Sequence, residues 1–298
     1  MKVLLINIDS KIPNFALKKI EKYHLDNEDE VIWNNELMAS ICDKTYVSCI
    51  FTKNKYKCRD FEGKAEIGGS GYDIYKKLPK EIEKVKPHIN LGFATRGCIR
   101  KCPFCIVPQK EGPIRIEADL YDIWDGKSKK VTFLDNNATA IKPHLILILH
   151  QLQKEKIYGE YNQGLDIRLL DDEIAQELKK TKLSELWFAW DNIQEQLLIE
   201  KGILNLKKAK IKSFRFYVLV GFNSTFEEDL YRFRTLKNIA IKEKLWLRPY
   251  CMRYEDHYND DKYIKLAQWV NMPWLFMKMD YPEAYTFMVN RSRYKKLV

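Results

Sequence analysis

The sequence predicts an α/β protein in two parts, and three observations support this prediction. Short apolar segments typical of buried strands alternate with longer segments that have helical spacing. Most of the helical segments are long enough for right-handed crossovers, which favour parallel strands. The alternation begins at residue 2 and restarts at residue 89. We therefore expect a six-unit parallel (β/α) partial TIM-type barrel, preceded by a small Rossmann-like α/β domain.

The small domain is predicted to span residues 1–87. Its expected elements are, in chain order, a strand at 2–8, a helix at 15–23, and strands at 29–35, 44–51 and 64–71, followed by a helix at 78–86. The last strand ends in a glycine-rich turn, Gly68–Gly71. Such a turn is by itself a weak signal for phosphate binding.

The barrel is predicted to span residues 88–255. Its six strands are expected at 89–95, 131–135, 164–170, 185–191, 214–221 and 245–251, with helices at 142–156, 171–180, 193–208 and 225–239. Residues 256–298 are expected to form a helical extension that covers the barrel. In parallel barrels the chemistry lies at the carboxyl ends of the strands, so polar residues there become site candidates.

Composition limits the class of protein. Of 298 residues, 46% are hydrophobic and 31% are charged, which is typical of a folded globular chain and excludes a disordered or small disulfide-stapled protein. The net charge of +10 indicates an anionic partner such as nucleic acid, although lysines scattered over solvated helix faces explain much of it.

The longest apolar run near the N-terminus predicts no membrane association. It extends from Val3 to Ile8, which is too short for a signal sequence or a membrane span. We therefore expect a cytoplasmic protein. In that reducing compartment, a close group among the seven cysteines favours a metal site or redox chemistry over disulfides.

Three thiols stand within eight residues, in a loop predicted directly after the first barrel strand. They are Cys98, Cys102 and Cys105. Soft thiolates in this number favour iron or zinc. A structural zinc site needs a fourth ligand, and the next cysteine along the chain is Cys251. Three ligands on a four-iron cluster would leave one iron open to a small molecule.

This motif resembles that of the radical S-adenosylmethionine superfamily. The resemblance rests on the spacing of the three cysteines, on aromatic Phe104 before the last of them, and on the position of the loop after the first strand. It implies that the cysteines hold a [4Fe-4S] cluster whose open iron chelates S-adenosylmethionine. It also implies a flavodoxin- or ferredoxin-like electron donor and cleavage of the cofactor to a 5′-deoxyadenosyl radical.

The resemblance covers residues 87–254 and implies further cofactor contacts. Gly221 lies in a strand-turn-helix segment similar to the family's Gly-x-Pro turn, where it would let the backbone approach the cofactor. Asn223 stands where the family often has Pro, and Thr225 with Glu228 fits a helix capping box. The remaining implied contacts are Asp135 or Asn136 to the amino group, Arg168 to the carboxylate and Asp191 to the ribose hydroxyls.

The small domain resembles a truncated version of the cobalamin-binding domains that precede some members of this family. It lacks their Asp-x-His-x-x-Gly signature, so a remnant used for packing or substrate contact is favoured over cobalamin binding. Cys42, Cys49 and Cys58 leave open an auxiliary cluster like that of methylthiotransferases. Buried thiols in a strand are the favoured interpretation.

The expected function is therefore that of a radical S-adenosylmethionine enzyme. Its substrate stays open between methyl or methylthio transfer to a nucleic acid or peptide and hydrogen abstraction from a small metabolite. The main alternative is a noncatalytic iron-sulfur or zinc protein that binds nucleic acid, with Cys251 as the fourth ligand. A redox carrier that consumes no cofactor is a third.

Overall fold

The computed structural model describes residues 1–294, and the chain divides into two compact units. The first comprises Met1–Val131 and the second begins at Thr132. Residues 88–131, which contain the three-cysteine loop, thus cluster with the N-terminal segment. The predicted functional domains 1–87, 88–255 and 256–298 remain predictions, and residues 295–298 of the last lie outside the described residues.

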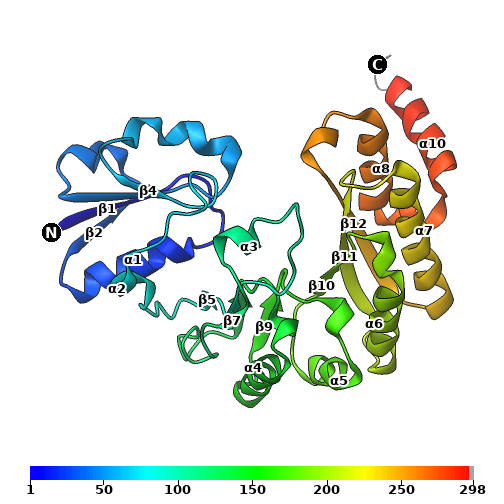
Figure 1. Ribbon diagram of the computed structural model, residues 1–298, viewed down its shortest axis with the longest axis horizontal. Coiled ribbons are helices and arrows are strands. Elements are labelled where there is room, and N and C mark those ends of the chain that lie inside the picture. The colour runs from blue at the N-terminus through cyan, green and yellow to red at the C-terminus, as the bar shows by residue number, and fades with distance from the viewer. Residues whose placement is uncertain (295–298) are drawn as a thin grey trace. The chain divides into compact units, whose positions relative to one another are not determined.

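The first unit contains a four-stranded parallel sheet, as expected. Its strands are β1 (Lys2–Asn7), β2 (Glu30–Trp33), β3 (Lys44–Ser48) and β4 (Glu66–Gly68), in the order β2-β1-β3-β4 (Figure 1). The helical segments around this sheet are α1 (Phe15–Asp26), η1 (Glu36–Ser40), η2 (Thr52–Phe61) and α2 (Lys80–Glu83).

Successive residues of β1 bury opposite faces of this sheet. Val3 and Leu5 pack with residues of α1 and α2, whereas Leu4 and Ile6 pack with residues of η2. A strand that is buried on both faces has a continuous run of apolar residues, and for this reason β1 is recognisable from the sequence. The expected helix at 78–86 is shorter than predicted, since Pro79 is its N-cap and only four residues follow.

Short elements complete the first unit. They are β5 (Leu91–Gly92), β6 (Thr95–Arg96), α3 (Val107–Lys110) and β7 (Arg115–Ile116). β6 pairs antiparallel with β7, so the predicted strand at 89–95 is divided into two pieces. The second piece belongs to a hairpin-like pair that brackets the three-cysteine loop.

The second unit alternates strands and helices. The strands are β8 (Lys130–Phe133, which begins in the first unit), β9 (Tyr158–Tyr161), β10 (Leu186–Ala189), β11 (Ser213–Val220) and β12 (Trp246–Arg253). The helices are η3 (Ala138–Ala140), α4 (Lys142–Glu155), η4 (Ile167–Leu169), α5 (Asp172–Lys180), η5 (Ile193–Glu195), α6 (Gln196–Lys208), α7 (Phe226–Glu243), η6 (Glu255–His257), α8 (Asp261–Asn271), α9 (Pro273–Lys278) and α10 (Tyr281–Tyr294).

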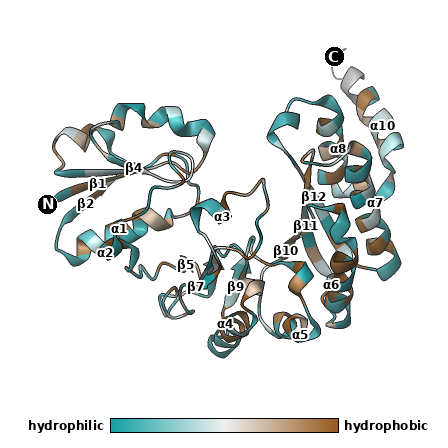
Figure 2. Ribbon diagram, viewed as in Figure 1, coloured by the Kyte–Doolittle hydropathy of each residue, from teal (hydrophilic) through white to brown (hydrophobic). Residues whose placement is uncertain are grey.

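The last three strands form a parallel sheet in the order β10-β11-β12. Alternate residues of β11 are buried, and α6 and α7, which show hydrophobic and hydrophilic residues side by side in Figure 2, lie along the sheet. An isolated parallel bridge between Gly159 and Leu183 joins β9 to the segment that precedes β10. Parallel sheets in a mixed α/β protein are thus confirmed, while closure into a six-unit barrel remains a prediction.

One predicted strand is wrong. Residues 164–170 are not a strand: the strand lies earlier, at β9, and Ile167–Leu169 form the 3-10 turn η4. Gly164 has a left-handed φ of +85°, and the side chain of Asp166 accepts a hydrogen bond from the amide of Arg168. This side chain-to-backbone bond stabilises a turn where the apolar alternation suggested a strand.

The helices expected after residue 256 are present within the described residues. α8 packs against β12, and the side chain of Asn271 accepts from the amide of Cys251 at 2.8 Å. Trp269 of α8 is fully buried. Whether these helices cover a barrel mouth stays a prediction.

Candidate functional site

The three-cysteine loop is held at its base by backbone contacts. Gly97 precedes Cys98 with a left-handed φ of +83°, and a Cβ there would lie 2.3 Å from the carbonyl oxygen of Pro113. The amide of Cys98 donates to the carbonyl of Gly112 at 3.3 Å. Gly97 is therefore required by the close approach of the two ends of the loop.

Arg96 anchors the same loop through ion pairs that the sequence analysis missed. Its guanidinium contacts Glu83 at 2.6 Å and Glu111 at 2.9 Å, and it lies over the ring of Phe93 at 4.7 Å. Glu83 also pairs with Lys19, whose side chain is only 3% exposed. These contacts connect the loop to α1 and α2, the helices that pack on the first sheet.

The thiols of the loop are half-buried. They are Cys98, Cys102 and Cys105, with half-buried Phe104 between the last two. The sulfur of Cys98 accepts from the amide of Arg100 at 3.3 Å, and the amide of Cys105 donates to the carbonyl of Cys102 at 3.0 Å. Among residues 1–294, no group of three His, Cys, Asp or Glu side chains converges in a metal-holding arrangement. Ligation by the three thiols therefore stays a prediction.

The second unit brings the carboxyl ends of β8 and β9 together. The amide of Ala138 donates to the carbonyl of Gly164 at 2.7 Å, and a Cβ on Gly164 would lie 2.2 Å from the carbonyl oxygen of Asp135. Asp135 is fully buried and Asn136 half-buried. Burial and the nearby Asp135 carboxylate raise the pKa of the buried Tyr161 hydroxyl well above its usual value.

Arg168 lies at the same edge but already has two carboxylate partners. Its guanidinium donates to both oxygens of Asp166, at 2.6 and 2.9 Å, and pairs with Glu195 in η5. The two carboxylates occupy the donors that were predicted to bind the carboxylate of the cofactor. The structure thus assigns Arg168 to linking the ends of β9 and β10, and its predicted cofactor contact is not tested.

Asp191 and Gly221 lie at the ends of adjacent strands and are joined by a buried network. Asp191 accepts from the amide of Leu219 at 3.0 Å, and its burial raises the pKa of its carboxyl group. Asp229 of α7, which is fully buried, accepts from the amide of Gly221 at 2.9 Å. Arg232 pairs with Asp229 and donates to the carbonyls of two residues at these strand ends, Trp190 at 2.6 Å and Leu219 at 2.7 Å.

A pattern in the sequence could have revealed this network. Asp229 and Arg232 follow Phe226 at three-residue spacing, which places all three on one face of α7. The positions around them on that face, such as Phe233 and Leu236, are apolar. Opposite charges three residues apart on an apolar helix face indicate a buried pair rather than a solvated one.

The turn after β11 differs from the family pattern in a physically defined way. Asn223 has a left-handed φ of +49°, which Pro cannot adopt because its ring fixes φ near −65°. Gly221 also has a left-handed φ, of +75°, and the space beside it is occupied by the ring of His257. The predicted capping box is confirmed, because Thr225 and Glu228 exchange side chain-to-backbone hydrogen bonds.

Cys251 is placed in the core. It is 4% exposed, and burial raises the pKa of its thiol. This position has a structural explanation, because a buried cysteine packs as a small hydrophobic residue. Cys251 as the fourth ligand of the alternative site stays a prediction.

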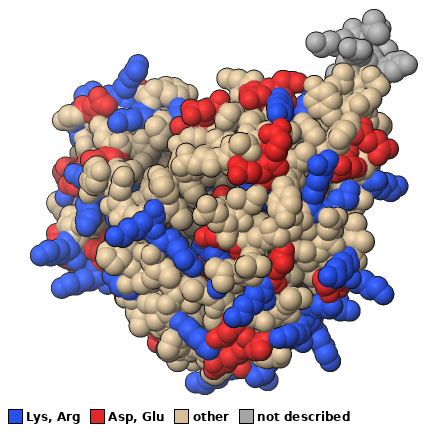
Figure 3. Space-filling view, turned by 45° about the vertical axis from the view of Figure 1, so that its right-hand side comes forward, with Lys and Arg blue, Asp and Glu red and all other residues tan. Residues whose placement is uncertain are grey.

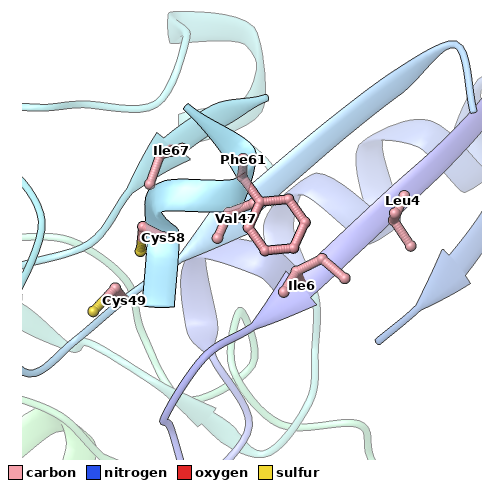
Figure 4. Packing of buried hydrophobic residues seen from close by; sticks show 7 residues of the cluster. All are labelled: Leu4, Ile6, Val47, Cys49, Cys58, Phe61 and Ile67. Carbon is pink, nitrogen blue, oxygen red and sulfur yellow. The ribbon is translucent and has the colours of Figure 1, made fainter. Parts of the chain in front are cut away.

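The N-terminal cysteines also belong to a hydrophobic core. Figure 4 shows Cys49 and Cys58 in the cluster with Val47, Phe61 and Ile67. The partly buried Cys42 packs against this cluster. Burial, with the nearby Asp9 carboxylate, raises the pKa of the Cys49 thiol to about 12, and burial raises that of Cys58. Their packing among apolar side chains favours the structural interpretation over an auxiliary cluster.

The glycine-rich turn of the first unit has a structural explanation. A Cβ on Gly69 would lie 2.3 Å from the carbonyl oxygen of Cys49, and one on Gly71 would lie 2.4 Å from the carbonyl carbon of Phe51. The glycines thus let the turn pack against the chain that follows β3. Ser70 of this turn accepts from the side chain of Lys110 in α3 at 2.8 Å.

Positive and negative side chains are mixed on one face of the molecule (Figure 3). On the face shown in Figure 3, Lys and Arg are interspersed with Asp and Glu. Such mixing is typical of a solvated surface. In residues 1–294, no helix has the length and apolarity needed to span a membrane.

Comparison with known proteins gives a likeness of fold. No protein-family model matches the chain, and no curated protein sequence matches it. Among solved structures, it is similar to TsrM from Kitasatospora setae, a radical S-adenosylmethionine methyltransferase determined with cobalamin and a [4Fe-4S] cluster bound. The TM-score is 0.63 at 11% identity, over 85% of this chain and 74% of that one. The chain therefore has a fold similar to that of a radical S-adenosylmethionine enzyme.

Proposed function

We propose that this protein is a radical S-adenosylmethionine enzyme, in which Cys98, Cys102 and Cys105 hold a [4Fe-4S] cluster. One observation carries the proposal: a three-thiol loop occurs in a chain whose fold is similar to that of such an enzyme. The donor set fits the group, because three soft thiols on one anchored loop leave one iron without a protein ligand. When bound and reduced, the cluster supplies the electron that cleaves S-adenosylmethionine.

The second unit supplies the polar groups proposed to position the cofactor. Asp191 presents a carboxylate at the end of β10, where it would accept hydrogen bonds from the ribose diol. Asp135 and Asn136 at the end of β8 are the proposed contacts of the amino group. Arg232 and Asp229 fix the backbone of Trp190, which precedes Asp191, and of Leu219 and Gly221 on the neighbouring strand, so the Asp191 carboxylate needs little reorganisation when a ligand binds.

The test is anaerobic reconstitution with iron and sulfide, reduction with dithionite in the presence of S-adenosylmethionine, and detection of 5′-deoxyadenosine by mass spectrometry. Wild type is expected to form 5′-deoxyadenosine and Cys102→Ala is not. Cys251→Ala is the matched control, since it removes a thiol that the proposal does not use. Loss of iron in Cys251→Ala, with an intact fold, would support the four-thiol alternative instead.

Methyl transfer with cobalamin is a second candidate. The likeness to TsrM covers 85% of the chain, and because the second unit alone is shorter than that share, it extends into the first unit. The first unit contributes a parallel sheet whose carboxyl edge carries Ser48 and Gly68. Incubation with hydroxocobalamin, gel filtration and absorbance spectra test this candidate: co-elution supports it, and a protein peak without the absorbance of cobalamin contradicts it.

A further inference from the structure

His257 lies directly over the Gly221 turn. A Cβ on Gly221 would lie 2.2 Å from Cδ2 and 2.9 Å from Nε2 of His257. Real Cβ atoms do not approach other atoms this closely, so the imidazole takes the space that a side chain at position 221 would need. The glycine therefore admits the ring of His257, a role that the sequence did not indicate.

The imidazole is held in one orientation by α8 and its N-cap. Nδ1 lies 3.2 Å from the carboxylate of Asp260, whose other oxygen accepts from the amide of Lys262. The ring packs on Tyr263 with a centroid distance of 4.2 Å. When the neutral ring donates from Nδ1 to the carboxylate, Nε2 is left as a hydrogen-bond acceptor.

Nε2 is the end of the ring that remains available. Within the part of the chain that the structure describes, no protein group forms a hydrogen bond with Nε2, and the side chain is 29% exposed. A polar atom that is oriented by a carboxylate and left without a protein partner is suited to recognise a ligand.

The position of His257 relates it to the proposed cofactor contacts. His257 follows β12, Gly221 follows β11 and Asp191 follows β10, and these three strands are parallel neighbours in one sheet. Their carboxyl ends therefore meet at one edge. A nucleoside whose ribose is bound at Asp191 would extend along this edge toward Gly221 and His257.

We propose that His257 binds the nucleoside part of S-adenosylmethionine through Nε2, with Asp260 as the residue that orients it. This assignment rests on the proposed function. The contact gives the site a polar acceptor for a ribose hydroxyl or an adenine amino group. It also explains why the partly exposed His257 packs against Gly221 at the carboxyl edge of this sheet.

The experiment is diethylpyrocarbonate modification of the anaerobically reconstituted protein, with each histidine quantified by peptide mass spectrometry. S-adenosylmethionine is added without reductant, and its binding is measured in parallel by equilibrium dialysis. His150 is the matched internal control, because it also pairs with a carboxylate, Glu177 at 3.1 Å, but lies on the outer helix α4. At a ligand concentration ten times its Kd, modification of His257 is expected to slow about tenfold, with His150 unchanged.

A second probe separates the two ends of the cofactor. 5′-Deoxyadenosine with methionine, added at saturating concentration, is expected to protect His257, whereas methionine alone is not. Bound S-adenosylmethionine that leaves His257 fully reactive would overturn the assignment and leave the proposed function intact. Failure of S-adenosylmethionine to bind at all would overturn both.

A variant tests the energetic role of Nε2. His257→Phe keeps a planar ring over Gly221 and Tyr263 but removes the acceptor, so the Kd for S-adenosylmethionine is expected to rise about threefold to tenfold. His150→Phe is expected to leave it unchanged. If His257→Phe binds as tightly as wild type while keeping the wild-type melting temperature, the proposal is wrong.

Discussion

The first unit contains two groups of three cysteines, and the surroundings of their sulfur atoms differ. Cys42, Cys49 and Cys58 belong to a hydrophobic cluster, and the last two are fully buried beneath the first sheet. The other group lies half-buried in a loop bracketed by β6 and β7. Burial favours the neutral thiol, whereas a loop that leaves sulfur atoms accessible allows thiolates to form and bind metal.

This difference shows that cysteine spacing alone is a poor guide to chemistry. Both groups lie within short sequence windows, and the sequence leaves an iron-sulfur cluster open as an interpretation of each. What separates them is the structure around the sulfur atoms: apolar side chains in one case, and a loop anchored by Arg96 in the other. The following predictions test that separation.

The largest expected effect is on iron binding. Cys98→Ala is expected to lose most of the iron after reconstitution, whereas Cys49→Ala is expected to keep the wild-type iron content and lose about 1 kcal/mol of stability from the core. Iron and sulfide assays, with chemical denaturation, measure both quantities. Equal loss of iron in the two variants would remove the distinction between the groups.

Thiol reactivity is expected to separate the groups before any metal is added. Because burial and Asp9 raise the pKa of Cys49 to about 12, its thiolate fraction at pH 8 is very small. Iodoacetamide should therefore alkylate Cys49 slower than Cys102 by about a hundredfold or more. The rates are measured on iron-free folded protein by peptide mass spectrometry. Similar rates for the two cysteines would contradict the prediction, because they would mean that the reagent reaches the buried thiol.

The loop should depend on its anchor. Arg96→Met keeps much of the apolar stem but removes the ion pairs with Glu83 and Glu111 and leaves Glu83 with Lys19 alone, which is expected to cost about 2 kcal/mol of stability. We expect faster loss of iron to a chelator from this variant. Arg59→Met, at an arginine of η2 far from the loop in sequence, is the comparison variant, and identical chelation rates in the two would contradict the prediction.

The smallest expected effect concerns Asp9, beside the buried thiols. Burial raises the pKa of its carboxyl group, but hydrogen bonds from Ile50, Asn54 and Phe51 outweigh this and lower the pKa overall. A lowered folded-state pKa means that the stabilisation is present above the unfolded value of 3.8 and is lost as the pH falls through the folded value.

Asp9→Asn is therefore expected to lose about 1 kcal/mol of stability at pH 7. The difference from wild type should shrink as the pH falls below 4. Urea unfolding at several pH values measures it. A difference that stays constant with pH would show that the carboxylate charge does not contribute.

Much of the fold could be predicted from the sequence, because buried parallel strands are continuous apolar runs. The strand at β1 and the alternating pattern at β11 are both of this kind. The prediction failed at 164–170, where Asp166 and a left-handed Gly164 form a turn. Local side chain-to-backbone hydrogen bonds of this kind leave no periodic signal.

The candidate site was predictable only where residue type carries the chemistry. The three cysteines of the loop are evident from the sequence, and Asp191 is suggested by its position after a strand. His257 and Arg96 were missed, because their roles come from contacts with residues far away in the chain. For Arg168 the sequence analysis expects a contact with the carboxylate of the cofactor. In the structure its nearest partners are the carboxylates of Asp166 and Glu195.

The pair formed by Arg232 and Asp229 has a consequence for the dynamics of the second unit. Both residues belong to α7, yet their side chains bind backbone groups of Trp190, Leu219 and Gly221 at two strand ends. This edge of the sheet therefore acquires its geometry only when the crossover helix α7 is docked. The amide of Gly221 should then exchange with solvent at the rate at which α7 opens, making hydrogen exchange at one amide a measure of the whole helix.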